Sequence, residues 1–553
     1  MERMRFLILT CVLALLRNRG EVCAQTRPNT GLGFIGRGYD LLSGNPEGGD
    51  EGGTDPGIKG NPIFQLTYPG GVRYPRELSF HTTDRPYVTS SRGTFHGYPS
   101  YAAKLASNIE IIGSNSGVFQ DLMFVDSYLY ESFASRFRTR GSVYYYTETS
   151  SRVGYARYKT EVASGNDYEL ERDFVLAALR LPTSYDPNNY SHNRFMSFFD
   201  TWGTHVIIGA EFGTRTGTIR EATPSEFVQY AASEMPTSLS AVNDTLTVDI
   251  EEFNHNLEHE MSFGSEYSTY VVGAEDISAE PIKLTLMLMS EVFKYDYWYG
   301  LNTYSERHFN WLIPSVRTAM LAALQNYPAY RQIQLIREAP ISIDLSWPEG
   351  TYGLPKARDG CPNSAIRFSE GRRRHDTENS NNANEWSDPL HLAGSVSHEN
   401  IEQQFCIKTV AEMSDDPWIF QPGTYCIYKR GDCPSGFTEG SIFWDDEDDQ
   451  NSNSRRGVLP DGNYDTNTRL EYCCRNDGRP TSAIYLPTRD NFFLFPRFDH
   501  CQEVHGMTVT SEYLFFDTED NNNADSVSGE YPFEGAISST GEILINLCYY
   551  QRI

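Results

Sequence analysis

Two motifs of the sequence have the residue types and spacing of chemical sites. His255-Asn-Leu-Glu258-His259 matches H-x-x-E-H, in which two histidines one helical turn apart bind zinc and the glutamate acts as a base. No third ligand lies nearby, and the chain has 12 histidines, so coincidence explains the match better. We therefore expect no enzyme.

Glycines near the N-terminus resemble a dinucleotide fingerprint. Gly31-Leu-Gly33-Phe-Ile-Gly36 fits G-x-G-x-x-G, which works only between a strand and the N-terminus of a helix. The following residues, 37–40, do not resemble the start of a buried helix. No G-x-S-x-G elbow, P-loop or catalytic-cysteine context occurs either, so we expect no cofactor.

Acidic motifs recur three times in the C-terminal half, at spacings of 69 and 72 residues, beginning at His375, Trp444 and Phe516. Clustered side-chain oxygens are ligands for Ca²⁺. The calcium candidates are Asp376, Glu378, Asp445, Glu447, Asp517 and Glu519. Asx-rich stretches also cap their own turns, and the regular recurrence without an established loop spacing favours such turns.

The first 24 residues predict a signal peptide, with Arg3 and Arg5 before an apolar stretch over Phe6–Leu16. That stretch is too short to span a bilayer, which takes about 20 apolar residues. No later stretch reaches this length, so we expect a secreted, soluble protein with residues 25–553 divided into domains. A chain of 553 residues holds roughly two to four of them.

A net charge of −28 excludes two kinds of partner. Nucleic-acid binding relies on clustered Lys and Arg, and simple attraction to anionic lipid needs the same residues. Any membrane binding must therefore come from specific recognition or from apolar insertion.

Cysteines divide the mature chain. Residues 25–360 contain none, so we expect a core-stabilised domain over 25–342 and a disulfide-rich domain over 343–553. Eight cysteines allow 105 connectivities. They are Cys361, Cys406, Cys426, Cys433, Cys473, Cys474, Cys501 and Cys548.

The C-terminal half also repeats as a whole, in units of about 70 residues over 347–420, 421–485 and 486–553. Each acidic motif has a cysteine before it and another, on a strand-like stretch, after it. These positions predict the pairs 361–406, 433–473 and 501–548, which leaves 426–474. Three β-rich units predict an all-β, disulfide-rich domain with a threefold repeat, closed in the manner of a β-prism.

Three motifs follow one another along the N-terminal half: Gly36–Pro46, Trp202-Gly203-Thr204-His205 and Tyr270–Gly273. In this order they resemble the opening, the signature and a later strand of MACPF, or perforin-like, domains, and the resemblance covers about residues 31–340. Val206 and Ala274 depart from it, where an aromatic residue and a second glycine are usual. The resemblance implies an α+β domain, a bent antiparallel sheet flanked by helical clusters, in which His205 is structural.

Glycines recur along the strand that follows the signature, at Gly209, Gly213 and Gly217. Glycine inside a strand marks a bend or a close approach of another backbone. We therefore predict that these positions lie where the central sheet bends; an ordinary kinked strand is the alternative.

The resemblance further implies two helical segments that unfold into membrane-spanning β-hairpins, within about 98–139 and 221–266. In the second, Leu246, Val248 and Ile250 alternate with polar residues, as lipid-facing positions of a barrel strand do. The alternative is that both segments are permanent surface helices.

Two glycosylation sequons occur, at Asn189 and Asn243. A glycan on Asn243 would lie inside the second predicted hairpin and would obstruct its insertion.

The C-terminal half closely resembles the apextrin C-terminal domain over 347–550, including Trp347–Pro355, Trp444–Asp448 and Cys473–Gly478. The resemblance implies extracellular targeting. We expect a secreted protein that binds a surface glycan or microbial wall component, assembles into a homo-oligomeric ring and inserts into a lipid membrane. A non-lytic protein of adhesion, development or innate immunity is the alternative, and either could act with a partner chain.

Overall fold

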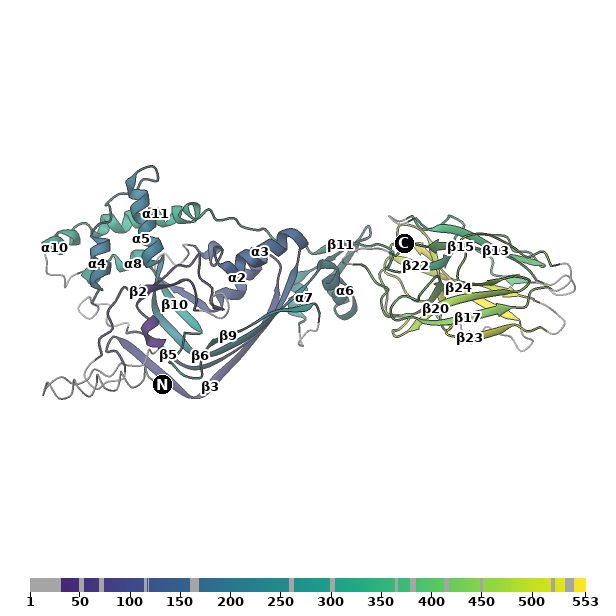
Figure 1. Ribbon diagram of the computed structural model, residues 1–553, viewed down its shortest axis with the longest axis horizontal. Helices are drawn as coiled ribbons and strands as arrows, with labels where there is room; N and C mark the ends of the chain where they lie inside the picture. Colours follow the sequence, from purple (N-terminus) through teal and green to yellow (C-terminus); the bar gives the residue numbers. More distant parts are fainter. Residues whose placement is uncertain are drawn as a thin grey trace, which may run out of the picture.

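The computed structural model places two domains end to end along the chain (Figure 1). It describes residues 31–48, 54–68, 74–113, 117, 119–159, 169–257, 263–298, 304–363, 367–377, 384–411, 417–447, 451–518, 523–532 and 542–553. The predicted signal peptide, residues 1–24, lies outside the described residues.

The N-terminal domain is built on a bent sheet in which four long strands lie in the order β3-β5-β6-β9. They are β3 (Leu78–Phe95), β5 (Val143–Tyr158), β6 (His205–Ala222) and β9 (Ser265–Gly273). Four shorter strands extend the sheet at the end where β6 begins: β1 (Arg37–Tyr39), β2 (Ile58–Pro62), β4 (Ile109–Ile112) and β10 (Lys283–Leu288). Neighbouring strands run antiparallel except β10 and β4, which are parallel. The predicted fold class is confirmed.

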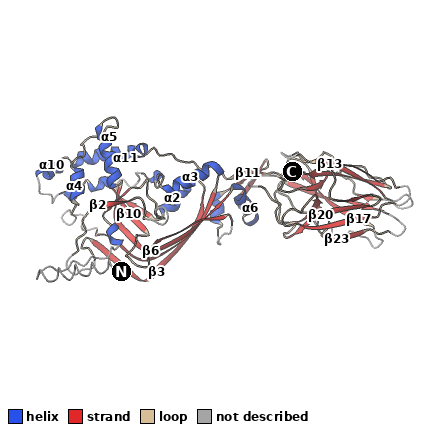
Figure 2. Ribbon diagram, viewed as in Figure 1, coloured by secondary structure: helices blue, strands red, loops and turns tan. Residues whose placement is uncertain are grey.

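Helices cover this sheet in separate groups (Figure 2). One group packs at the end of the sheet farthest from the C-terminal domain: α4 (Arg172–Ala178), α5 (Tyr190–Trp202), α8 (Met289–Val292), α9 (Tyr295–Trp298), α10 (Tyr304–Asn310) and α11 (Ile313–Tyr330). The other helices belong to segments that connect long strands of the sheet along the chain. These are α2 (Tyr98–Ala106) and α3 (Tyr128–Arg140) between β3 and β5, and α6 (Pro224–Glu234) and α7 (Ile250–His255) between β6 and β9. Short 3-10 helices complete the domain: η1 (Gly31–Phe34), η3 (Gln120–Leu122) and η5 (Pro236–Ser238).

The three predicted bend glycines lie along β6, and each is crowded. The strand pairing shifts register opposite Gly209 and beside Gly213. Gly213 has φ +148°, and a Cβ there would stand 1.9 Å from the carbonyl oxygen of Ser151. A Cβ on Gly217 would meet the ring of Tyr270 at 2.3 Å. These three positions therefore admit no side chain without movement of their neighbours.

Gly213→Ala is expected to lower the free energy of unfolding of the N-terminal domain by about 2 kcal/mol or more, because the added methyl collides with backbone. Gly60→Ala is the matched control, since nothing lies within 4 Å of the added carbon there. Thermal unfolding of both variants measures the difference. Equal melting temperatures would contradict the steric argument.

The C-terminal domain consists of strands alone in its described part. In chain order they are β12 (Tyr352–Pro355), β13 (Ser369–Asp376), β14 (Glu385–Trp386), β15 (Asn400–Lys408), β16 (Thr424–Lys429), β17 (Thr438–Trp444), β18 (Ser454–Gly457), β19 (Gly462–Tyr464), β20 (Thr468–Asn476), β21 (Phe492–Pro496), β22 (Met507–Phe516), β23 (Ser526–Gly529) and β24 (Ile543–Arg552). The predicted all-β class is confirmed.

Equivalent strand pairs recur along this domain. The long strands pair as β13·β15, β17·β20 and β22·β24, and the short strand after each acidic motif pairs with another unit, as β14·β22, β18·β13 and β23·β17. The strand pairs show which residues lie opposite one another, but they do not define a symmetry axis. The threefold repeat and the β-prism therefore stay predictions.

Four disulfides join the eight cysteines, in the pairs 361–406, 426–474, 433–473 and 501–548. This is the connectivity that the within-unit scheme predicts. Each bridge closes a loop of 40 to 48 residues. Cross-links of this kind restrict the unfolded chain and so stabilise the domain.

The domain boundary predicted at 343 falls inside a strand, β11 (Ser342–Asp344). This strand belongs to the N-terminal side, because it pairs with β8 (Thr245–Val248), which pairs in turn with β7 (Leu239–Val242). Residues 342–344, which directly precede the C-terminal domain, therefore form a three-stranded sheet with β8 and β7.

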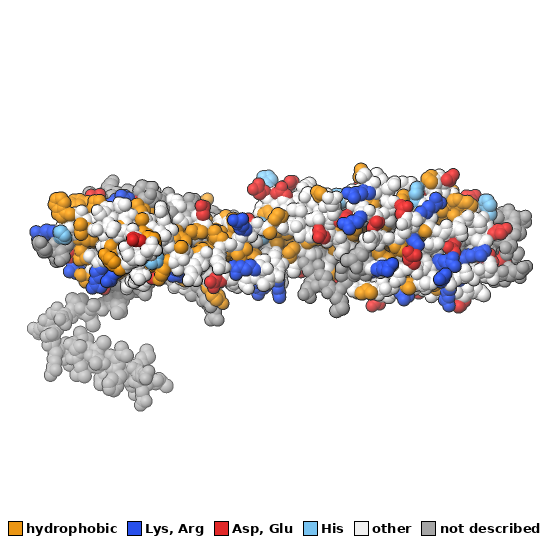
Figure 3. All heavy atoms as spheres, turned by 90° about the horizontal axis from the view of Figure 1, so that it is seen from above, with side chains coloured by type: hydrophobic (Ala, Val, Ile, Leu, Met, Phe, Trp, Pro, Cys, Tyr) orange, Lys and Arg blue, Asp and Glu red, His pale blue; other side chains and the backbone are white. Residues whose placement is uncertain are grey.

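No helix within the described ranges is long and apolar enough to cross a membrane. On the face in Figure 3, acidic and basic side chains are interspersed over the C-terminal domain, and hydrophobic side chains gather at the opposite end of the molecule. Trp311, which is 85% exposed, lies between α10 and α11.

Candidate functional site: two segments between sheet strands

The signature residues fasten the chain opening to the start of β6. Gly203 ends α5 with φ +83°, and a Cβ on it would stand 2.6 Å from the carbonyl oxygen of Tyr39. The Thr204 hydroxyl accepts a hydrogen bond from the backbone N–H of Leu41 at 3.1 Å. His205 is fully buried, and burial lowers its pKa to about 3. The imidazole is therefore neutral and structural, and Trp202 packs in the core against Phe174 and Phe198.

The two candidate segments leave the bent sheet at one common level. Residues 96–142 connect β3 to β5, and residues 223–264 connect β6 to β9. The last strand pairs before them are Phe95↔Tyr144, Val143↔Ala222 and Glu221↔Ser265. Each segment thus joins two adjacent antiparallel strands at the same end of the sheet.

Aromatic residues hold helix α3 of the first segment on the sheet. The ring centroids of Phe133 lie 5.1 Å from Phe95 of β3 and 4.8 Å from Tyr144 of β5. The Ser127 side chain caps the helix by accepting from the N–H of Tyr130. Local capping and tertiary stacking thus both favour the helix in this state.

The first segment differs from the expected helical cluster. Between α2 and α3 it contains strand β4, which pairs in parallel with β10, as in Leu284↔Ile109. Ile109-Glu-Ile-Ile112 is a short apolar run, a pattern that suits a buried strand as well as a helix turn. Release of the whole segment must therefore break this pairing.

A buried ion pair fastens helix α2 to the chain opening. Lys104 and Glu47 pair while 6% and 5% exposed, and the ammonium lies over the rings of Phe95, Tyr146 and Tyr270 at 5.6, 5.1 and 5.3 Å. Burial lowers the pKa of Lys104 to about 7, and the charge of Arg215 lowers it further, while the carboxylate of Glu148 opposes this shift. Sequence reasoning missed this contact; its signal was a lone lysine within Tyr101-Ala-Ala-Lys104-Leu-Ala.

A second buried network crosses the sheet beneath the first segment. Arg215 of β6 is fully buried, with its Nε 3.6 Å from Glu148 of β5, and it donates to the carbonyl oxygen of Ile282 at 2.7 Å. The Tyr270 hydroxyl of β9 donates to Glu148 at 2.6 Å. Three neighbouring strands are therefore cross-linked by charge inside the domain.

Glu280 gives this region a pH dependence. Burial raises the pKa of Glu280 to about 7 from an ordinary value of 4.5, and the carboxylate accepts from the N–H of Asp55 at 2.8 Å. Because the folded state binds this proton more tightly than the unfolded state, stability rises as the pH falls from about 7 to about 4.5. Glu280→Gln is expected to raise the melting temperature at pH 8 and to change it little at pH 5. An equal change at both pH values would contradict the assignment.

The second segment packs in a small apolar cluster that it shares with the ends of β5 and β6 and with residues of the C-terminal domain. Helix α6 begins with a capping box between Thr223 and Glu226. Leu246 and Val248, predicted to face lipid, are 0% and 4% exposed and share a core cluster with Phe227 of α6, while Ile250 is partly buried. In this state the three residues are core residues of a folded segment.

The remaining predicted residues fall at surface positions or outside the described part. Asn189 caps α5, where its side chain accepts from the N–H of Ser191 at 2.8 Å. Asn243 is exposed at the turn between β7 and β8. His255 ends α7, but Glu258 and His259 lie outside the described residues, so the zinc motif is not described as a unit.

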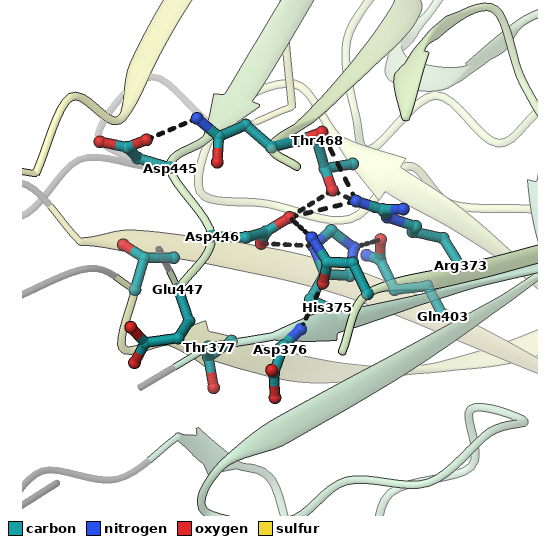
Figure 4. Close-up of polar contacts among 12 residues, drawn as sticks. Arg373, His375, Asp376, Thr377, Gln403, Asp445, Asp446, Glu447 and Thr468 are labelled. Atoms are coloured by element: carbon teal, nitrogen blue, oxygen red, sulfur yellow. Dashed lines mark hydrogen bonds and ion pairs between the residues drawn. The ribbon is translucent and has the colours of Figure 1, made fainter. Parts of the chain in front are cut away.

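Two of the three acidic motifs of the C-terminal domain meet around a buried aspartate, Asp446 (Figure 4). Asp446 accepts hydrogen bonds from Thr468 at 2.5 Å and from Asn453 at 2.8 Å, and it lies 3.1 Å from His375 Nδ1 and 3.4 Å from Arg373. All but Asn453 are buried. The cluster joins two units by satisfied polar contacts.

Aromatic rings that begin the three motifs also touch one another. The ring centroids of His375, Trp444 and Phe516 are 5.2 to 5.4 Å apart in all three pairs. The motifs that recur in the sequence are therefore neighbours in space, at the ends of β13, β17 and β22.

Two of the calcium candidates accept hydrogen bonds from residues far from them in the sequence, and not from their own turns. Asp376 accepts from the N–H of Ser452 at 2.7 Å, and Asp445 accepts from Asn467 at 2.7 Å and from the N–H of Ala524 at 3.0 Å. The described residues contain no group of three or more side chains that could hold a metal ion. Two of the candidates, Glu378 and Glu519, lie outside the described part of the chain, and calcium binding there stays a prediction.

Two protein-family models match the chain. The MAC/Perforin domain matches residues 28–286, and the C-terminal domain of apextrin matches residues 347–550. Together with the bent sheet and its two flanking segments, these matches define a perforin-like protein. The chain therefore carries a MAC/Perforin domain, followed by the C-terminal domain of apextrin as its second domain.

Solved structures resemble the chain at low identity. GNIP1Aa from Chromobacterium piscinae is 14% identical, with a TM-score of 0.32 over 81% of this chain and 82% of that chain. A putative cell invasion protein with a MAC/Perforin domain from Bacteroides thetaiotaomicron VPI-5482 is 12% identical, with a TM-score of 0.28 over 61% and 67%. Astrotactin-2, a conserved vertebrate-specific and perforin-like membrane protein, is 9% identical, with a TM-score of 0.24 over 90% and 71%. No curated protein matches.

Proposed function

We propose that this chain is a secreted pore-forming protein. It binds a target surface through its C-terminal domain, assembles into a homo-oligomeric ring, and inserts β-hairpins from residues 96–142 and 223–264 into the lipid membrane. The observation that supports this is the common level at which both segments leave the sheet. If either segment extends, its two arms continue an existing antiparallel strand pair in register.

The second segment is long enough for this role. Arms of ~20 residues reach about 65 Å at ~3.3 Å per residue, which exceeds a hydrocarbon core of ~30 Å. Leu246 and Val248 would exchange the apolar core of the segment for lipid, and the alternating Thr245 and Thr247 would face the lumen. In lipid, every backbone group must be hydrogen-bonded, so only a closed barrel of many such hairpins suffices.

The edges of the bent sheet suit ring assembly. Among the described strands, β3 pairs only with β5 and β9 only with β6, so each has a free edge. Residues 81–92 of β3 are exposed. A long strand with unpaired backbone groups is a template for a strand of a neighbouring copy. We infer that β3 of one subunit meets β9 of the next.

The C-terminal domain is proposed as the recognition module for a surface glycan or microbial wall component. Its acidic and basic side chains are interspersed on the face shown in Figure 3, so surface charge does not favour nucleic acid there. We further propose that the protein is not an enzyme.

Purified protein incubated with dye-loaded liposomes tests the proposal. Rings in negative-stain images together with dye release are expected. Release without rings would contradict assembly, and rings without release would contradict insertion. Since the surface ligand is unknown, vesicles coated with peptidoglycan fragments form a second arm, and monomers without release in both arms would overturn the pore-forming function.

The second candidate function is a non-lytic binding protein. Two observations favour it: β4 ties the first segment into the sheet, and the sequon residue Asn243 is exposed at the tip of the β7–β8 hairpin. A glycan there would block entry of this tip into lipid. Peptide mass mapping of the secreted protein, before and after glycosidase treatment, shows which residue carries sugar; a glycan on Asn243 favours the non-lytic function.

A further inference from the structure

We propose that residues 336–345, here called the strap, hold both insertion segments closed under the control of the C-terminal domain. The inference rests on the proposed function, because it concerns the release of those segments. It identifies a single element whose displacement would free the two segments together.

The strap first crosses helix α2 of the first segment. The backbone N–H of Tyr98 donates to the carbonyl oxygen of Ile336 at 3.2 Å, and the N–H of Ile336 donates to the hydroxyl of Tyr130 at 3.2 Å. The Glu338 carboxylate then accepts from the N–H of Ser100 at 2.7 Å. A carboxylate at the first turn of a helix satisfies a free N–H group and complements the helix dipole. The strap thus caps α2.

The strap next becomes a strand of the second segment. The N–H of Val248 donates to the carbonyl oxygen of Ile341 at 3.0 Å, and β11 continues the pairing along β8. The hydroxyl of Thr245 donates to Asp344 at 2.7 Å. Without the strap, the β7–β8 hairpin would be two-stranded, and isolated hairpins are marginally stable in water. The third strand is therefore supplied by the linker.

The C-terminal domain then fixes the same hairpin directly. Asp244 at the hairpin turn accepts from the N–H and the hydroxyl of Thr488 at 2.7 and 2.8 Å. Gln229 of α6 donates to the carbonyl oxygen of Pro417 at 3.0 Å. Trp418 and Tyr485 of the C-terminal domain are each 3% exposed and belong to the apolar cluster of the second segment.

These contacts form one continuous path. The C-terminal domain docks on α6 and on the hairpin, the hairpin pairs with the strap, and the strap caps α2. Movement of the C-terminal domain on binding its target would withdraw Trp418 and Tyr485 from the core of the second segment and pull on the strap. Both segments would then lose protection at once.

Two substitutions loosen the docking without weakening the local structure. Asn243 and Asp244 have φ +51° and +64°, a two-residue turn in which glycine at the second position is favoured, so Asp244→Gly suits the turn while removing its contact with Thr488. Gln229→Ala increases helix propensity while removing the bond to Pro417 and a bond to Ser225 within α6. Neither substituted residue lies in α2, so loss of protection in Tyr98–Ala106 must come from the lost docking.

Hydrogen exchange of the soluble monomer, without membrane, tests the inference. In the double variant we expect exchange to become about tenfold faster both in Thr245–Val248 and in Tyr98–Ala106. Glu402→Ala is the matched control, since it breaks an exposed ion pair with Arg372 elsewhere in the C-terminal domain, and it should change neither segment. Faster exchange in the hairpin alone would overturn the coupling through the strap. Unchanged exchange in both Thr245–Val248 and Tyr98–Ala106 would overturn the inference that docking of the C-terminal domain protects the two segments. Because no membrane is present, failure of pore formation would leave this result intact.

Discussion

A disulfide formed by Thr247→Cys and Ser342→Cys is expected to reduce dye release from liposomes at least about a hundredfold, and mild reduction is expected to restore it. Hydrogen bonds at Val248–Ile341 and at Leu345–Asp244 flank this pair, so Thr247 and Ser342 form a non-hydrogen-bonded pair. Such pairs have Cα atoms about 4.5 Å apart, which suits a disulfide. The bridge would tie β8 to the strap.

The expected loss follows from the geometry of insertion. Thr247 lies in the middle of the second segment, so an extended arm must carry it far from the strap. A bridged strap would have to follow into lipid with unsatisfied backbone groups, which costs several kcal/mol for each group. Each single cysteine variant and the native chain with the same reductant are the controls. Full leakage from the oxidised double variant would show that the second segment does not leave the strap.

Removal of one partner of the buried pair Lys104–Glu47 is expected to lower the free energy of unfolding by about 3–5 kcal/mol, because the other partner stays buried and uncompensated. Lys104→Met leaves a buried carboxylate, and Glu47→Leu leaves a buried amine. The double variant should be far closer to the native chain, since replacing both charges by apolar groups of similar volume is often nearly neutral. Denaturant unfolding of all four proteins gives the coupling energy.

The exposed ion pair Arg372–Glu402 serves as the comparison for this cycle. Its side chains are 48% and 15% exposed, so its coupling should stay below about 1 kcal/mol. A coupling energy at Lys104–Glu47 as small as that of the exposed pair would contradict its role in holding the first segment.

Lys104 lies on α2 of the first segment, so loss of its pair with Glu47 should make this segment easier to release. Single variants at the buried pair should therefore release dye from liposomes at a lower protein concentration than the native chain.

Much of the architecture was predictable because its signals are local. The restriction of the cysteines after residue 24 to Cys361–Cys548 predicted a disulfide-rich second domain, and matched cysteine positions predicted the pairs that the structure contains. The segment from Trp202 to His205 predicted the start of the central strand. The sequence also predicted that glycines such as Gly213 lie on this strand where a neighbouring backbone comes close, because a residue without a side chain can be recognised from the sequence.

The sequence alone determined the two domain types, the order of signature and segments, and the cysteine pairing scheme, because each depends on residue identity and spacing along the chain. Tertiary structure alone decided what holds the segments closed. Lys104 meets Glu47, and Asp244 meets Thr488, through contacts between residues far apart in sequence. The strands β4, β7 and β8, which lie inside segments expected to be helical clusters, and the pairing of β11 with β8 were not predicted for the same reason. Short strands gain their stability from a distant partner strand, and no local pattern names that partner.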